Sequence, residues 1–240
     1  MVNFWKIVDS VINKADILLM VVDARLVEQT RNLEIERKVK AAGKPLITVI
    51  NKADLVDKAD LEPLKKKLSP CVFVSAQKFY GMTMLRHEIL RLSQGSACTV
   101  GVLGYPNTGK SSIINSLKGK SSAGVSPISG FTKGKQNIKV DSKIMVIDTP
   151  GVISDQPTSS FVLQTSVSSI KDPELVVFEL LSLHKQVVLE YYGVEDSSDP
   201  EEILEAIAFK LNKVAKGGVA DTQTAAKMIL QDWQKGKMQL

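Results

Sequence analysis

The stretch GYPNTGKSS, at residues 104–112, restricts the possible folds of this chain more than any other feature. It fits the pattern G-x-x-x-x-G-K-[ST], in which glycines let the backbone curl and turn its N–H groups toward phosphate. The pattern has this meaning only when a buried strand precedes it and a helix follows it. The apolar run at residues 98–104 predicts the strand, and residues 111–117 predict the helix. The sequence therefore predicts an α/β fold that carries a phosphate-binding loop.

Five further apolar runs have the composition of strands, at residues 16–24, 45–51, 71–76, 135–140 and 143–149. Nearly continuous Val, Ile and Leu is typical of strands that are covered on both faces, and segments of helical or loop character separate the runs. We therefore expect a mostly parallel, six-stranded sheet with flanking helices. Only Asp141 and Ser142 separate the last two runs, so these strands are predicted to form a hairpin.

The strand pattern ends near residue 168, and the remaining chain is predicted to be helical. The expected helices lie at residues 172–193, 199–215 and 220–237, with Asp172, Asp199 and Asp221 as N-caps. We therefore expect two domains, an α/β domain at residues 1–167 and a small all-α domain at residues 168–240. Its aromatic side chains Phe178, Tyr191 and Trp233 are expected in the core rather than as platforms for RNA bases.

Composition narrows the class of protein. The chain has 240 residues, 44% of them hydrophobic, which is enough for one core and a smaller second domain. No apolar run approaches the ~20 residues of a membrane-spanning helix, and the first residues lack the pattern of a secretory signal peptide. Cys71 and Cys98 lie in strand-like runs and fit neither a disulfide framework nor a zinc site. We expect a reduced, cytoplasmic protein with no membrane partner.

The positive charge is unevenly distributed. The net charge is +5, and residues 110–143 contain seven lysines with Asp141 as their one acidic residue. A balance of this kind is compatible with a surface that faces RNA. A solvated, lysine-rich surface explains the same numbers equally well.

The motif NKAD, at Asn51–Asp54, follows the apolar run at residues 45–51. A buried Asp54 carboxylate accepts hydrogen bonds from guanine N1–H and N2–H₂, which adenine does not offer, and so it penalises ATP. Asn51 is expected to reach N7 and the phosphate loop, and the Lys52 stem to cover one face of the base. In SAQ, at residues 75–77, the Ala76 N–H is expected to meet guanine O6.

The motif DTPG, at residues 148–151, ends another predicted strand. Downstream of a phosphate loop, Asp148 is expected to hold Mg²⁺ through water and the Gly151 N–H to contact the γ-phosphate. Taken alone, DTPG fits a strand that ends in a turn equally well. The polar stretch at residues 126–136 is expected to be a mobile switch whose Thr132 hydroxyl closes on Mg²⁺, the alternative being a plain surface loop.

These motifs define a set of candidate site residues. The predicted nucleotide-binding residues are Asn51, Lys52, Asp54, Ser75, Ala76, Gln77, Asn107, Thr108, Gly109, Lys110, Ser111, Ser112, Thr132, Asp148 and Gly151. The predicted catalytic residues are Lys110, Thr132 and Gly151, and the predicted Mg²⁺ ligands are Ser111, Thr132 and Asp148. Lys110 is expected to bridge the β- and γ-phosphates.

The order of the motifs is unusual, because NKAD and SAQ precede the phosphate loop, the switch threonine and DTPG. This order resembles the circularly permuted GTPases of the YlqF/YawG (RbgA-like) family. VVDARLVEQTRN, at residues 21–32, is similar to the family segment VDAR-x-P…RN, with Val27 in place of the usual Pro. SGFTKG, at residues 129–134, stands where the family often has GTTRG, and it keeps Thr132 in place.

The resemblance implies a circularly permuted P-loop GTPase domain, with GTP or GDP and Mg²⁺ as ligands, and a helical domain that contacts ribosomal RNA. It also implies a role in assembly of a ribosomal subunit or its precursor. Val152 stands where many GTPases have a glutamine that orients water, so we expect slow hydrolysis that a partner or K⁺ accelerates. Asn107 occupies the position that helps bind K⁺ in potassium-activated relatives. We expect a monomer.

Two other functional classes were weighed. A GTP-sensing adaptor that recruits a protein partner with little hydrolysis is compatible with Val152. An RNA-modifying enzyme has little support, because His87 and His184 are the two histidines and no nucleophile or metal cluster accompanies them.

Overall fold

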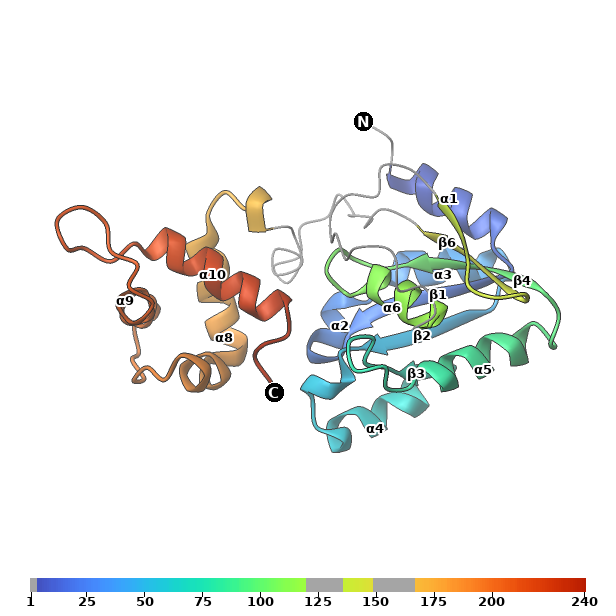
Figure 1. The fold of residues 1–240 in the computed structure, drawn as a ribbon, viewed down its shortest axis with the longest axis horizontal. Coiled ribbons are helices and arrows are strands. Elements are labelled where there is room, and N and C mark those ends of the chain that lie inside the picture. The colour runs from blue at the N-terminus through green and yellow to red at the C-terminus, as the bar shows by residue number, and fades with distance from the viewer. Residues whose placement is uncertain (1–3, 120–135, 149–166) are drawn as a thin grey trace. The chain divides into compact units, whose positions relative to one another are not determined.

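The computed structural model describes residues 4–119, 136–148 and 167–240 (Figure 1). The chain divides into two compact units, residues 1–156 and 157–240, and each is described below by itself. The predicted domain boundary at residues 167–168 stays a prediction, because residues 149–166 lie outside the described residues. In the part of the chain that the structure describes, none of the helices has the length and apolar character that crossing a bilayer requires.

The described residues of the first unit form a six-stranded sheet. In chain order the strands are β1 (Ile17–Asp23), β2 (Leu46–Asn51), β3 (Cys71–Phe73), β4 (Cys98–Leu103), β5 (Gln136–Lys139) and β6 (Ile144–Asp148). In space the order is β3-β2-β1-β4-β6-β5, and every pair is parallel except β5 with β6. The predicted sheet and its hairpin are therefore confirmed, although β3 ends earlier than the run at residues 71–76 suggests.

Helices cover both faces of this sheet (Figure 1). Apolar side chains of α1 (Phe4–Lys14), α3 (Leu33–Ala41) and α4 (Lys58–Lys67) pack with one face. Those of α5 (Met82–Leu92) and α6 (Lys110–Lys118) pack with the other. All seven residues of β1 are buried as a result, which explains the unbroken apolar sequence of the first six.

The strand order determines where a site can form. Strand β1 lies between β2 and β4, and Asp23 at its end is the register partner of Asn51. The carboxyl ends of parallel strands meet at one edge of a sheet, where ligands of open α/β folds bind. The loop after β2 and the loop after β4, 50 or more residues apart in sequence, therefore flank the end of β1.

The second unit packs three long helices together: α8 (Pro173–Tyr192), α9 (Pro200–Lys210) and α10 (Thr222–Gln234). Asp199 and Asp221 cap α9 and α10 by accepting hydrogen bonds from backbone N–H groups, as predicted. Helix α9 is shorter than the predicted segment at residues 199–215. Asn212 adopts a left-handed backbone (φ +53°), which ends a helix, and a bridge between Val214 and Ala220 closes the turn that follows.

Asp172 is the N-cap residue of α8 and Pro173 follows it, as predicted, although the Asp172 side chain makes no cap hydrogen bond within the described residues. The expectation that Tyr191 lies in the core was wrong. Tyr191 is 41% exposed, whereas the adjacent Tyr192 and Trp233 are buried and Phe178 is half-buried. Neighbouring residues of a helix point about 100° apart, so only one of two consecutive tyrosines faces the core.

Candidate functional site

The loop between β4 and α6 has the backbone of an anion-binding loop. Gly104 (φ +141°) approaches β1 so closely that a Cβ there would lie 2.4 Å from the Val21 carbonyl oxygen. Asn107 (φ +58°) and Gly109 (φ +94°) are also left-handed, and the Thr108 hydroxyl donates to the Tyr105 carbonyl at 2.9 Å. Repeated left-handed residues form the concave turns whose N–H groups hold phosphate.

Lys110 is the first residue of α6 and lies over this loop. Its side chain is buried, with the residue 6% exposed, and Nζ donates to the Tyr105 carbonyl oxygen at 2.6 Å. Ser111 and Ser112 follow in the first helical turn and are exposed. An ammonium group, a helix N-terminus and a free hydroxyl at one loop are the groups that a nucleoside phosphate and its Mg²⁺ require, so these residues fit both ligands.

Asn51, at the end of β2, joins two loops that are distant in sequence. Its Nδ2 donates to the Thr108 carbonyl at 2.8 Å, and its Oδ1 accepts from the Ala76 N–H at 3.1 Å. The residue is 3% exposed. From α6, the Ser116 hydroxyl donates to the Ala76 carbonyl at 2.6 Å. The phosphate loop and the SAQ loop are thus parts of one hydrogen-bonded arrangement. In it the Ala76 N–H, which we expected at guanine O6, donates to Asn51 instead.

Asp54 and the SAQ loop lie next to each other at the same edge. The Asp54 side chain is 15% exposed, and its Oδ2 lies 3.2 Å from Nζ of Lys78, a residue just beyond SAQ. Ser75 is buried and accepts at Oγ from the Lys78 N–H at 3.2 Å, while Gln77 is exposed. A partly exposed carboxylate with one lysine beside it is free to accept further hydrogen bonds from a base.

Asp23 and Arg25 are two residues of this edge that motif analysis missed. Asp23 ends β1, and its Oδ2 lies 2.6 Å from Lys52 Nζ and 2.9 Å from Arg25 Nη2. Its Oδ1 also accepts from Arg25 Nε at 3.1 Å. Burial raises the pKa of the Asp23 carboxyl, but the charges and hydrogen bonds of Lys52 and Arg25 hold this pKa well below its ordinary value. The sequence signal that could have identified Asp23 is its position: it is a polar residue at the end of a continuous apolar run, in the strand before the one that leads into NKAD.

Part of the predicted site lies outside the described residues. This applies to Thr132 and Gly151, and to the side chain of Asp148, whose backbone ends β6. Within residues 4–119, 136–148 and 167–240, no group of three His, Cys, Asp or Glu side chains is placed to hold a metal ion. The roles of these three residues toward Mg²⁺ therefore stay predictions.

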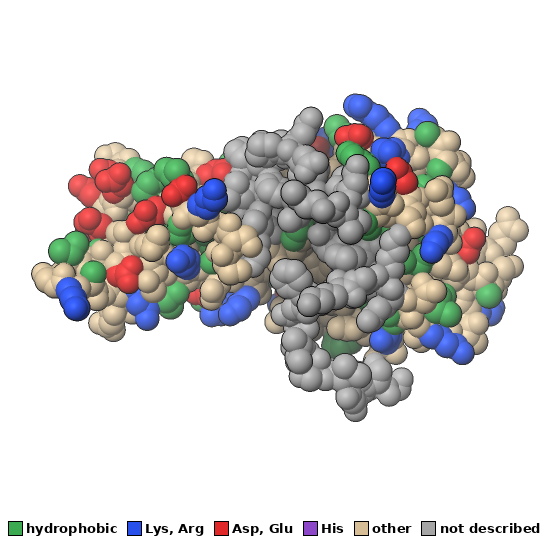
Figure 2. Space-filling model, turned by 90° about the horizontal axis from the view of Figure 1, so that it is seen from above, with side chains coloured by type: hydrophobic (Ala, Val, Ile, Leu, Met, Phe, Trp, Pro, Cys, Tyr) green, Lys and Arg blue, Asp and Glu red, His purple; other side chains and the backbone are tan. Residues whose placement is uncertain are grey.

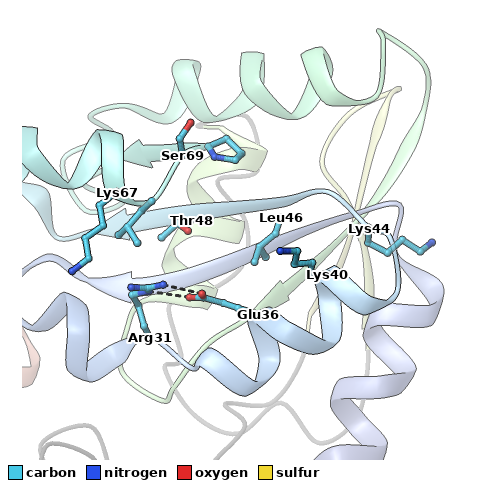
Figure 3. A pocket seen from close by; sticks show the side chains of 10 residues that line it. Arg31, Glu36, Lys40, Lys44, Leu46, Thr48, Lys67 and Ser69 are labelled. Atoms are coloured by element: carbon cyan, nitrogen blue, oxygen red, sulfur yellow. Dashed lines mark hydrogen bonds and ion pairs between the residues drawn. The ribbon is translucent and has the colours of Figure 1, made fainter.

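A hollow of about 310 Å³ lies elsewhere on the first unit, beside the amino-terminal half of β2 (Figure 3). Its cationic side chains are Arg31, Lys40, Lys44 and Lys67. Arg31 points at Glu36 and donates to it twice, at 3.0 and 2.8 Å, and Lys67 Nζ lies 2.7 Å from a Glu28 oxygen. Because carboxylates already neutralise half of these cations, we assign the phosphates to the loop after β4 instead.

The sheet, the phosphate loop after β4 and NKAD after β2 define the class as P-loop GTPases in permuted order. Residues 1–135 match the family described as Elongation factor Tu GTP binding domain, and residues 99–213 match 50S ribosome-binding GTPase. The chain belongs to the GTPases described as Elongation factor Tu GTP binding domain, whose match covers more than half of it. Its fold is that of the circularly permuted GTPase YlqF. GNP-bound YlqF from T. maritima has the same fold, with a TM-score of 0.66 at 22% identity over 97% of this chain and 94% of that one.

Curated relatives extend over both units. An uncharacterized GTP-binding protein of Methanocaldococcus jannaschii is 39% identical over 243 residues, 97% of this chain and 65% of the relative. Nuclear/nucleolar GTPase 2 of Arabidopsis thaliana is 34% identical over 252 residues, 98% of this chain and 44% of the relative. The chain thus spans about half to two thirds of the length of these relatives.

Proposed function

We propose that the protein binds GTP with Mg²⁺, hydrolyses it to GDP and phosphate, and acts as a nucleotide-dependent factor in the assembly of a ribosomal subunit. The observation that carries the proposal is the pair of hydrogen bonds by which Asn51 joins the phosphate loop to the SAQ loop. This link brings a base-reading carboxylate and a phosphate-binding lysine to the same edge. The proposal of a ribosomal partner is supported by the match to the 50S ribosome-binding GTPase family and by the similarity to a nuclear/nucleolar GTPase.

Phosphoryl transfer requires positioning and charge neutralisation more than covalent chemistry. In the proposed site Lys110 supplies a positive charge to the β- and γ-phosphates, and the N–H groups of the loop at residues 104–110 hold their oxygens. Ser111 would contribute an oxygen ligand to Mg²⁺, and the ion would supply positive charge to the leaving group. Asp54 reads the guanine. Thr132, Asp148 and Gly151 are proposed to complete the γ-phosphate side.

Hydrolysis is proposed to be slow without a partner. Val152, outside the described residues, has an apolar side chain that forms no hydrogen bond to water. A partner, or K⁺ bound beside Asn107, would supply the missing polarisation. If Asn107 has no such role, the rates in K⁺ and Na⁺ will be equal.

The helical unit is the proposed contact with ribosomal RNA. Residues 206–240 contain six lysines and two aspartates, although residues 171–240 as a whole are acidic. Figure 2 shows Lys and Arg side chains on the surface together with separate groups of acidic side chains. Lys216, in the turn after α9, is exposed and suited to phosphate contacts, whereas Lys210 on α9 donates to the Gly193 carbonyl oxygen. We propose that the protein acts as a monomer where subunits are assembled, in the cytoplasm or the nucleolus.

The test is GTP hydrolysis at saturating substrate in K⁺ buffer, alone and with purified small or large ribosomal subunits. Lys110→Ala serves as the blank. Stimulation by one subunit supports the assembly factor and identifies its target. Tight GTP binding without stimulation by either subunit would favour a GTP-sensing adaptor that recruits a protein partner.

A further inference from the structure

The end of β1 lies where a bound nucleotide must pass. The base-reading loop follows β2, the phosphate loop follows β4, and β1 lies between these strands. A nucleotide that reaches both loops therefore crosses the carboxyl end of β1, which is Asp23. The inference drawn from this position rests on the proposed nucleotide site.

Asp23 is held by a complete set of partners. Its backbone N–H donates to the Thr30 hydroxyl at 3.0 Å, and its Oδ1 accepts from the Arg25 N–H at 3.0 Å. The Arg25 guanidinium donates hydrogen bonds to both oxygens of the Asp23 carboxylate, at 3.1 and 2.9 Å. The exposed fractions of the Arg25 and Asp23 side chains are 1% and 6%. The carboxylate therefore has one orientation, and its Oδ2 is presented to Lys52.

The charges of this group suit an anionic ligand. A buried carboxylate without cations would be costly and would repel phosphates that approach the same edge. Arg25 and Lys52 set two cationic side chains against the one carboxylate of Asp23, although burial lowers the pKa of Lys52. Asp23 is thereby able to lie beneath a nucleotide in its ionised form.

Lys52 is the member of the group that belongs to NKAD. Its backbone is left-handed (φ +61°), and its Nζ lies 2.6 Å from Asp23 Oδ2. The backbone of Lys52 follows β2 and its ammonium is fixed at the end of β1, so the four-carbon stem runs between the two strand ends. A free lysine stem has many rotamers, and ordering it during binding would weaken affinity.

We propose that Asp23 is a positioning residue for the nucleotide site, which holds the Lys52 stem in place for the guanine nucleoside before the nucleotide arrives, while Arg25 orients Asp23. Asp23 acts through Lys52 and does not contact the phosphates. Removing either side chain therefore removes the same contribution to nucleotide retention.

The test measures release of a fluorescently labelled GDP from the full chain by stopped flow. The variants are Asp23→Asn, Lys52→Met and the double variant, with the thermal midpoint recorded for each. We expect each single variant to release the nucleotide roughly tenfold faster, the scale set by one hydrogen bond to a charged group. The double variant should be no faster than the faster single variant.

Glu36→Gln is the matched control, because Glu36 is also a carboxylate gripped twice by an arginine but lies in the hollow beside β2. Its release rate should stay within twofold of the wild type. Where Asp23→Asn does not fold, Asp23→Glu replaces it. Asp23→Glu keeps the charge but moves the carboxylate by one methylene, so the nucleotide should again be released faster than from the wild type. Adding Lys52→Met to Asp23→Glu should not increase the release rate beyond that of the faster single variant.

The outcomes separate this inference from the proposed function. Release at the wild-type rate from the folded Asp23 variant, or effects of that variant and of Lys52→Met that multiply in the double variant, would overturn the positioning role alone. Failure of the folded wild type to bind labelled GDP would overturn the proposed site, and the positioning role with it.

Discussion

Asn51 donates a buried hydrogen bond of 2.8 Å to the carbonyl of Thr108, a residue 57 positions further along the chain. The first residue ends a strand in the early part of the chain, and the second belongs to the phosphate loop. The bond explains why a chain with the proposed base-reading segments at its front can still place them beside the phosphate loop. A permutation changes the order of the strands along the chain, but it leaves their neighbours in the sheet unchanged.

Replacing Asn51 by alanine is expected to weaken both the fold and the site. The buried Thr108 carbonyl and Ala76 N–H would each lose a partner, at roughly 1–3 kcal/mol per group, so we expect a loss of about 2–6 kcal/mol in unfolding free energy. Affinity for GDP should fall at least tenfold. Urea unfolding measures the loss of stability, and calorimetric titration measures the affinity for GDP. Asn137→Ala, on the exposed surface of β5, should change stability by less than about 0.5 kcal/mol, and equal losses from the two variants would contradict the account.

Asp54→Asn is expected to exchange guanine for xanthine as the preferred base. Xanthine has a carbonyl oxygen where guanine has its 2-amino group, so an amide donor suits the first and a carboxylate the second. GDP should bind roughly 100-fold more weakly and XDP more tightly than to the wild type, as expected when a polar group at the base is left unpaired. Competition against labelled GDP measures both. An unchanged preference for GDP would place the base elsewhere.

Gly109→Ala is expected to disrupt the phosphate loop through a specific clash. A Cβ at this position would lie 2.1 Å from Asn51 Nδ2, and the backbone is left-handed (φ +94°). Gly43→Ala is the matched control, because Gly43 is also left-handed (φ +65°) but has no atom within 4 Å of a Cβ. We expect the control to lose only about 1 kcal/mol of unfolding free energy and to keep GDP affinity. Gly109→Ala should lose GDP affinity as well, and similar affinities for the two variants would argue against the observed loop.

Tyr192→Phe tests the core of the helical unit and its dependence on pH. The Tyr192 hydroxyl donates to Asp232 at 3.1 Å, and burial together with the Asp232 charge raises the pKa of Tyr192 far above its ordinary value. Because the folded state favours the neutral phenol, this stabilisation is fully present below the unfolded pKa of about 10 and decreases as pH rises above it. Near neutral pH the variant should be about 1–2 kcal/mol less stable.

The difference between wild type and Tyr192→Phe should therefore become smaller between pH 10 and pH 11. Unfolding followed by tryptophan fluorescence in a Trp5→Phe background reports on this unit, because the other tryptophan, Trp233, lies in its core and is 1% exposed. A difference that grows with pH would show that the phenol ionises more easily in the folded protein.

Local patterns were sufficient to predict much of the fold. The continuous apolar character of residues 17–22 indicated a strand covered on both faces, and all of them are buried. The separation of two runs by Asp141 and Ser142 left only a hairpin as a connection, and β5 and β6 pair antiparallel. In these cases the physical cause acts between residues that are near each other in sequence.

Features that depend on tertiary contacts were not predicted. The end of α9 depends on the left-handed Asn212, and the choice between Tyr191 and Tyr192 depends on how α8 is rotated against its neighbours. Asp23 and Lys52 lie 29 residues apart, and their contact follows from the pairing of β1 with β2, which hydrophobic patterns do not specify. For Thr132, which lies outside the described residues, the role in the site stays a prediction.

We propose that the segments at residues 51–77 and 104–112 form one guanine-nucleotide site. Calorimetric titration of the full chain with GDP and with ADP, in the presence of Mg²⁺, measures the affinity of this site for each base, with Lys110→Ala and Asp54→Asn as variants. We expect one bound GDP per chain and at least about 100-fold weaker binding of ADP, since adenine leaves the Asp54 carboxylate unpaired. We also expect Lys110→Ala to abolish tight binding of GDP and Asp54→Asn to abolish the preference for GDP. One guanine-nucleotide site is the proposal under test. Equal affinity for GDP and ADP, or GDP binding that survives both substitutions, would contradict it.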